Sequence, residues 1–178
     1  MPAEQVVSSE TQVTALTLQY FRNGLHCSEA ILRAFNEVYN LGFETQYYKI
    51  ATGFGSGMGK SGCCCGTVTG AVMVLGLIAG RTKNYESEKI VYAATQELHE
   101  KFRANHKALC CRVLTKNVVW SSAEHKMLCA QYVSDTARIT GEIIRERLWE
   151  YLPEGGSRHV ALKRNPLALL RYITGRGK

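Results

Sequence analysis

The chain has 178 residues, of which 46% are hydrophobic, and its formal net charge is +7. This length fits one domain that buries a core without cross-links, so disulfides are not needed for folding. Residues 1–13 are polar and lack the pattern of a secretory signal peptide, which predicts a cytoplasmic protein with reduced thiols. The seven cysteines therefore need another explanation.

The positive charge indicates an acidic partner or surface, but it does not indicate nucleic acid. No basic run carries interleaved aromatic residues, and no zinc-finger spacing occurs. The longest apolar run, residues 72–79, ends at Arg81. It is shorter than the roughly 20 residues that span a bilayer, so we expect a buried helix there and no integral membrane segment.

Helical periodicity dominates the first part of the chain. A first helix is predicted at about residues 11–22. A second begins near Ser28 and ends at residues 40–42, because its apolar side chains recur at spacings of three and four. Its inward face carries Ile31, Leu32, Phe35, Val38 and Tyr39.

The third predicted helix, residues 66–80, contains two pairs of glycines spaced by four. They are Gly66 with Gly70 and Gly76 with Gly80. Each interior glycine costs about 1 kcal/mol relative to alanine. The spacing therefore predicts that another backbone or a functional group approaches this helix closely.

Two further helices are predicted, at about residues 86–105 and 122–151. The first has an inward face of Ile90, Val91, Ala94, Leu98 and Phe102, and the second of Met127, Val133, Ala137, Ile144 and Leu148. No segment of convincing length alternates like a β-strand, and no repeat is present. We therefore expect an all-α bundle of about five to six helices, formed by residues 1–157.

The tail, residues 158–178, is the densest basic segment. Pro166, preceded by the capping residue Asn165, is predicted to begin a short helix with an apolar face. We expect this face to dock on the bundle or on a second copy of the chain, as in a homodimer. A docking site for an acidic redox partner protein is the alternative.

The glycine-rich stretch GFGSGMGKSGCCCG, residues 53–66, resembles a phosphate-binding loop at Gly59-Lys60-Ser61. However, Phe54 replaces the first glycine of that pattern, and no apolar strand precedes it. We therefore expect no nucleotide cofactor. The glycines instead let the chain adopt positive φ angles and approach another group closely, and the cysteines that follow are the candidates.

The cysteines lie in four separate regions of the chain, at Cys27, Cys63-Cys64-Cys65, Cys110-Cys111 and Cys129. None forms a C-x-x-C pair. This excludes the thioredoxin motif, the paired zinc-ribbon spacing and the covalent haem motif, so no haem is expected. Any shared site must be assembled by the fold.

Cys27 and Cys65 are each predicted at the N-terminus of a helix, where free N–H groups and the helix dipole stabilise a thiolate. Cys129 taken alone, within a helix, fits core packing better, because reduced cysteine is often buried. Core packing does not account for three consecutive cysteines after a glycine loop, since loops rarely supply it.

Two histidines stand four residues before a cysteine, His106 before Cys110 and His125 before Cys129. Either could share a helix face with the sulfur. A solvated surface position is the more common one for such a histidine, and we expect it here.

Four segments in this order carry a family resemblance: residues 24–32 around Cys27, the glycine loop into Cys65-Gly66-Thr67-Val68-Thr69-Gly70, residues 111–114, and residues 129–133. Together they resemble the redox-associated C-GCAxxG-C-C family from about residue 14 to about residue 152. This chain reads Cys-Gly where the family label reads Gly-Cys, and Thr67 stands where alanine is usual. A similar cysteine-bearing domain occurs in split-Soret cytochromes, which bind an iron–sulfur cluster beside c-type haems.

The resemblance implies a redox role, with an iron–sulfur cluster as cofactor and a redox partner protein. A two-iron cluster is the simplest, because it needs four ligands. The implied ligands are Cys27, Cys65, Cys111 and Cys129, with Cys63, Cys64 and Cys110 as substitutes. The loop residues Gly57, Gly59 and Gly66 would bring backbone N–H groups to the cluster.

Two alternatives remain open. One is a metal-free thiol–disulfide oxidoreductase that uses Cys64 with Cys65 or Cys110 with Cys111, since strained disulfides are labile. The other is a structural zinc protein. We expect the four implied ligands to converge at one end of the bundle.

Overall fold

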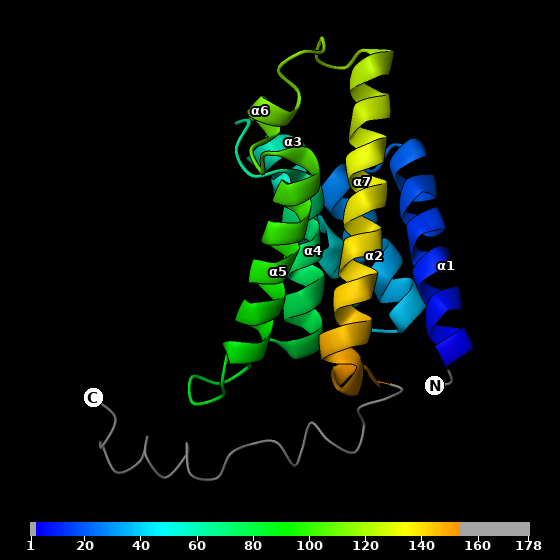
Figure 1. The fold of residues 1–178 in the computed structure, drawn as a ribbon, viewed down its shortest axis with the longest axis vertical. Coiled ribbons are helices and arrows are strands. Elements are labelled where there is room, and N and C mark those ends of the chain that lie inside the picture. The colour runs from blue at the N-terminus through cyan, green and yellow to red at the C-terminus, as the bar shows by residue number, and fades with distance from the viewer. Residues whose placement is uncertain (1–2, 154–178) are drawn as a thin grey trace.

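The computed structural model describes residues 3–153, with side chains from residue 9 onward, and this part of the chain is all-α (Figure 1). The α-helices are α1 (Ala3–Arg22), α2 (Cys27–Tyr39), α3 (Gly55–Met58), α4 (Gly66–Ala79), α5 (Lys89–His106), α6 (Cys111–Leu114) and α7 (Ala123–Ile143). The all-α prediction is confirmed. The count exceeds the expected five to six because α6 is a single turn and α3 is a short turn in which Ser56 and Gly57 have left-handed backbone angles. Neither is long enough to show periodicity.

Three shorter elements complete the described chain. A 3₁₀ helix, η1 (Thr45–Phe54), precedes α3. The π-helical η2 (Ile144–Leu148) and the 3₁₀ helix η3 (Trp149–Tyr151) follow α7 in the chain. The described residues contain no β-strand, and Cys64 and Cys110 form an isolated antiparallel bridge.

The five long helices run side by side, and α3 lies next to α6 at one end of the bundle (Figure 1). α1 packs against α2 and α7, α2 packs against α4, and α5 packs against α4 and α7. The fully buried side chains between them include Ile31, Phe35, Leu75, Leu98, Phe102 and Ile139. Burying one such side chain contributes about 1.5–3 kcal/mol, so this shared core holds the helix ends in place.

The backbones of helices α2 and α4 approach each other closely at Gly70. A Cβ atom added there would lie 2.8 Å from the carbonyl oxygen of Ser28. The predicted close approach is therefore found at the first glycine pair of α4. It is not found at Gly76, where nothing lies within 4 Å of an added Cβ atom.

One predicted core position is wrong. Met127 is 68% exposed, whereas Val133, Ala137, Ile144 and Leu148 are buried. At about 100° per residue, Met127 lies about 120° around the helix from Val133. Apolar character alone had placed it on the inward face.

The segment before the glycine loop is the 3₁₀ helix η1, not the buried strand that a phosphate-binding loop follows. The Ser28 hydroxyl of α2 donates a hydrogen bond to the carbonyl oxygen of Ala51 at 2.7 Å. The Thr52 hydroxyl likewise donates to Glu29 Oε1 at 2.5 Å. These bonds fix η1 against the start of α2 and so set where the glycine loop begins.

Within residues 3–153, no helix has both the length and the apolar character needed to cross a bilayer. The predicted tail helix at Pro166, its docking face and the boundary at residue 157 lie outside the described residues. They stay predictions.

Candidate cysteine site

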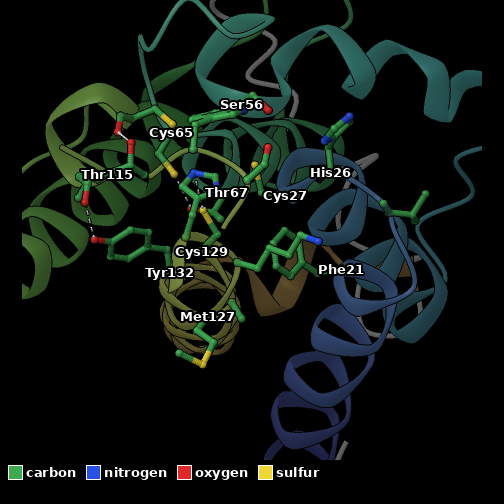
Figure 2. Close-up of a pocket in the computed structure, with 18 of the residues that line it drawn as sticks. Phe21, His26, Cys27, Ser56, Cys65, Thr67, Thr115, Met127, Cys129 and Tyr132 are labelled. Atoms are coloured by element: carbon green, nitrogen blue, oxygen red, sulfur yellow. Dashed lines mark hydrogen bonds between the residues drawn. The ribbon is translucent and has the colours of Figure 1, made fainter. Parts of the chain in front are cut away.

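Four cysteines from four helices line one cavity of about 580 Å³. Cys27 is the first residue of α2, Cys65 precedes α4, Cys111 begins α6 and Cys129 lies on α7. Figure 2 shows Cys27, Cys65 and Cys129 gathered close together. The cavity lies at the end of the bundle that carries α3 and α6, so the structure brings together the four thiols that the resemblance implies.

The other three cysteines do not line this cavity. Cys63 is exposed, and Cys64 and Cys110 are half-buried. All seven cysteines are free thiols. Among the adjacent cysteines, the structure therefore places Cys65 and Cys111 at the cavity and their neighbours outside it.

The loop over the cavity makes a left-handed turn. The five consecutive residues 56–60 have positive φ angles between 56° and 68°. Three of them, Ser56, Met58 and Lys60, are not glycine, and this conformation costs about 1–2 kcal/mol for each such residue. The turn brings Gly57 against Cys111, where an added Cβ atom would lie 2.5 Å from the Cys111 Cβ.

Gly66 makes the same kind of contact with Cys27. A Cβ atom on Gly66 would lie 2.3 Å from Cys27 Sγ and 3.0 Å from the carbonyl oxygen of Phe54. The expectation that the glycines approach the cysteines therefore holds at Gly57 and Gly66. Gly59 differs, because only the Gly53 oxygen, at 3.8 Å, is near an added Cβ, and its role is the positive φ angle.

Burial raises the pKa of all four cavity thiols. Desolvation raises the pKa of Cys27 and of Cys129 to about 12 and that of Cys111 to about 11. Burial also raises the pKa of Cys65. In addition, a charge on Cys65 raises the pKa of the other three thiols, so Cys65 is the member that interacts with all of them.

The helix N-termini act on two of these thiols in the predicted direction. At Cys27 the backbone of Ser56, in the glycine loop, lowers the pKa more than that of Ser28 at the start of α2 does. At Cys65 the backbone groups of Thr67 and Val68, at the start of α4, lower the pKa. Desolvation is the larger effect at both sulfurs. The backbone N–H groups therefore act in the predicted direction, but the net pKa of both thiols is raised because burial outweighs them.

Thr67 gives Cys65 a hydrogen-bond partner. Its Oγ1 lies 3.5 Å from Cys65 Sγ and 2.9 Å from Thr136 Oγ1 on α7. The residue that replaces the usual alanine thus connects the cysteine to a second buried hydroxyl. Sequence reasoning missed Thr136, because nothing local marks a contact between residues so far apart in the chain.

His125 shares a helix face with Cys129, as its spacing allowed. Its Nε2 lies 3.7 Å from Cys129 Sγ, and its ring packs against Trp120 in a tilted arrangement with centroids 4.4 Å apart. The favoured surface position is wrong for His125, which is only 9% exposed, because Trp120 covers it. Ser122 begins α7 by accepting a hydrogen bond from the His125 N–H at 3.1 Å, which holds the histidine in the first turn.

His106 does not face Cys110. Its Nε2 lies 3.1 Å from Asp135 Oδ2, and its ring packs against Phe102 and Tyr132. The side chain therefore belongs to the contact between α5 and α7. Tyr132 in turn donates a hydrogen bond to the carbonyl oxygen of Leu114 at 3.0 Å, and it lines the cavity.

The charged residues that line the cavity are all basic: Arg22, Lys60 and Lys126. No aspartate or glutamate of the described chain lines it. In residues 9–153, whose side chains are described, no group of three or more Cys, His, Asp or Glu side chains is arranged to hold a metal ion. The thiols surround a space instead of meeting at one point.

The chain matches a protein family model over residues 25–143, a span that contains all seven cysteines. The family is described as "Putative redox-active protein (C_GCAxxG_C_C)". The chain belongs to this family. Membership confirms the resemblance and marks this C_GCAxxG_C_C protein as redox-active, without naming a cofactor. No curated protein and no solved structure matches the chain.

Proposed function

We propose that this C_GCAxxG_C_C protein is an electron carrier that binds an iron–sulfur cluster, of the two-iron type, through Cys27, Cys65, Cys111 and Cys129. The observation that supports it is the cavity of about 580 Å³ lined by these four thiols. A two-iron cluster takes four cysteine ligands. The redox-active family supplies the function class.

The distribution of donors fits a cluster better than a single ion. Structural zinc is bound by four ligands that meet at one tetrahedral centre. A cluster spreads its ligands over separate irons, so it needs no three donors at one point. The four thiols that line one cavity are compatible in number and kind with the ligands of such a cluster.

The surroundings of the cavity also fit. Four thiolates and the bridging sulfides leave a two-iron cluster with a net negative charge. The basic side chains of Arg22, Lys60 and Lys126 line the cavity and favour a negative ligand. No acidic residue of the described chain lines the cavity, so none would repel a negatively charged cluster there.

A bound cluster would supply reversible one-electron transfer. The chain would hold and shield it: Gly57 and Gly66 leave room where side chains would meet the cysteines, and the Thr67 hydroxyl faces Cys65 Sγ. Hydrogen bonds to ligand sulfurs tune a potential. Because the cavity thiols are protonated at neutral pH, ligation releases protons, and binding strengthens as pH rises.

Metal and sulfide analysis of anaerobically reconstituted protein tests this proposal. We expect iron and acid-labile sulfide in equal amounts, lost in Cys65→Ser and Cys129→Ser. The matched control is Cys63→Ser, which changes an exposed cysteine outside the cavity and should keep both. A colourless, iron-free protein overturns the proposal, and zinc without sulfide selects the structural zinc alternative.

A further inference from the structure

Two cysteines outside the cavity face each other across the bundle end. Cys64 and Cys110 form an isolated antiparallel bridge. On one side of it the Cys65 N–H donates to the Leu109 carbonyl oxygen at 2.8 Å, and on the other the Cys111 N–H donates to the Cys63 carbonyl oxygen at 2.6 Å. Cys64 and Cys110 are therefore a directly opposed pair without backbone hydrogen bonds to each other.

This type of pair suits a disulfide. Directly opposed residues without mutual hydrogen bonds have Cα atoms about 4.5 Å apart, with side chains on the same face. A disulfide needs a Cα separation of about 4.4–6.8 Å. The Cys110 Sγ also donates to the Gly62 carbonyl oxygen at 2.8 Å, which places its sulfur against the segment that carries Cys64.

The same geometry disfavours disulfides between adjacent cysteines. Successive side chains of an extended segment point to opposite faces. Cys65 and Cys111 line the cavity, whereas Cys64 and Cys110 do not. We therefore expect Cys64 and Cys110 to face away from the cavity that Cys65 and Cys111 line.

We propose that Cys64 and Cys110 are a second redox site, a dithiol that reacts with low-mass disulfides and closes to a disulfide across the bridge. One sulfur attacks the small disulfide as a thiolate and forms a mixed disulfide, releasing one small thiol. The second sulfur attacks the mixed disulfide and releases the other small thiol. Two protein thiols and one small disulfide thus become one protein disulfide and two small thiols, and protons and electrons balance.

The surroundings favour a negatively charged small disulfide. Arg112 is exposed, and its Nη2 donates to the Ser61 carbonyl oxygen at 2.8 Å, which holds the guanidinium over the loop before Cys64. Both cysteines of the pair are half-buried and lie outside the cavity. The pair thus consists of thiols other than the four proposed cluster ligands, although each is next to one of these ligands in the chain. Oxidised glutathione, which carries carboxylates, is a suitable probe.

Peptide mapping after equilibration of the full chain with oxidised and reduced glutathione tests the proposal. Free thiols are blocked, and the protein is digested with trypsin without reduction. Cleavage after Lys60, Arg81, Lys107 and Arg112 gives peptide 61–81 with Cys64 and peptide 108–112 with Cys110. We expect these two peptides to be joined, with the loss of two hydrogen atoms.

Serine variants assign the pair, because both peptides hold neighbouring cysteines. Cys64→Ser and Cys110→Ser should each lose the joined peptides, whereas the matched control Cys63→Ser should keep them. If one serine variant does not fold, the other, on a separate segment, makes the same test. A disulfide within one peptide, glutathione bound at Cys63 as the sole product, or joined peptides that persist in Cys64→Ser would overturn the proposal.

Discussion

Gly66, the first residue of α4, lies so close to Cys27 that an added Cβ atom would be 2.3 Å from the Cys27 sulfur. Because the neighbouring Phe54 oxygen would be only 3.0 Å away, the helix cannot shift easily to make room. The space next to Cys27 therefore depends on the absence of a side chain at this position.

We expect Gly66→Ala to destabilise the protein by roughly 1–3 kcal/mol, the usual cost of overpacking a filled site, and to displace the Cys27 thiol. Gly76→Ala is the matched control, because it lies in the same helix with nothing within 4 Å of an added Cβ. It should gain up to about 1 kcal/mol from helix propensity. Chemical denaturation measures both, and equal stabilities for the two variants would contradict the prediction.

The cavity thiols predict how stability depends on pH. A cysteine in the unfolded chain has a pKa of about 8.5, whereas burial raises the pKa of Cys27 and Cys129 in the folded chain to about 12. The folded chain thus binds more protons between these values. This difference in proton binding favours the folded chain fully at a pH below the thiol pKa of the unfolded chain. The contribution is lost as pH rises toward the thiol pKa of the folded chain.

For metal-free protein we therefore expect the free energy of unfolding to fall from about pH 8.5 upward. Cys27→Ala should flatten this fall. Burial also raises the pKa of Tyr39 to about 12. Because a tyrosine in the unfolded chain has a pKa of about 10, Tyr39 contributes to the fall in stability only at higher pH. Denaturation at several pH values measures the effect, and a free energy that stays constant between these two unfolded pKa values argues against the buried thiols.

Thr67 is expected to tune Cys65. Removing its hydroxyl in Thr67→Val leaves the Cys65 sulfur without the 3.5 Å contact, which should raise the pKa of Cys65 further. In reconstituted protein the same change should shift the reduction potential to more negative values, since hydrogen bonds to ligand sulfurs stabilise the reduced cluster. Thr67→Ser should restore the wild-type potential. Equal potentials for all three proteins would show that the hydroxyl has only a packing role.

Trp120 is expected to limit access to the cavity. Its indole packs against His125 beside Cys129, yet it is 43% exposed and lies at the surface. Trp120→Ala should speed the alkylation of Cys129 in metal-free protein. Val119→Ala is the control, because Val119 is the preceding residue, is 75% exposed and does not line the cavity. Unchanged alkylation in Trp120→Ala would mean that the cavity opens elsewhere.

The long helices could be predicted because each has several apolar residues at helical spacing. Single turns such as α3 and α6 have no such period, and the left-handed turn at residues 56–60 includes three residues that usually avoid it. Its conformation follows from contacts with Cys63 and Cys111, which lie outside the turn. Local sequence alone therefore could not reveal it.

The cavity cysteines were implied by the family resemblance, and the structure adds what a one-dimensional pattern lacks. Thr136 and Trp120 reach the site through contacts between distant parts of the chain. The direction of the thiol pKa shifts depends on burial, which also comes from the assembled bundle. The helix positions of Cys27 and Cys65 predicted only the backbone hydrogen bonds that lower the thiol pKa, and these are weaker than the desolvation that raises it.

The most direct test of the central claim is electron paramagnetic resonance of the anaerobically reconstituted protein before and after chemical reduction. The account predicts no signal in the oxidised protein and a signal from one unpaired electron per chain after reduction, as expected for a two-iron cluster. This signal should persist in Cys63→Ser and disappear in Cys65→Ser. A protein that binds no iron, or one whose signal survives loss of Cys65, would contradict the claim that the four cavity thiols hold a cluster.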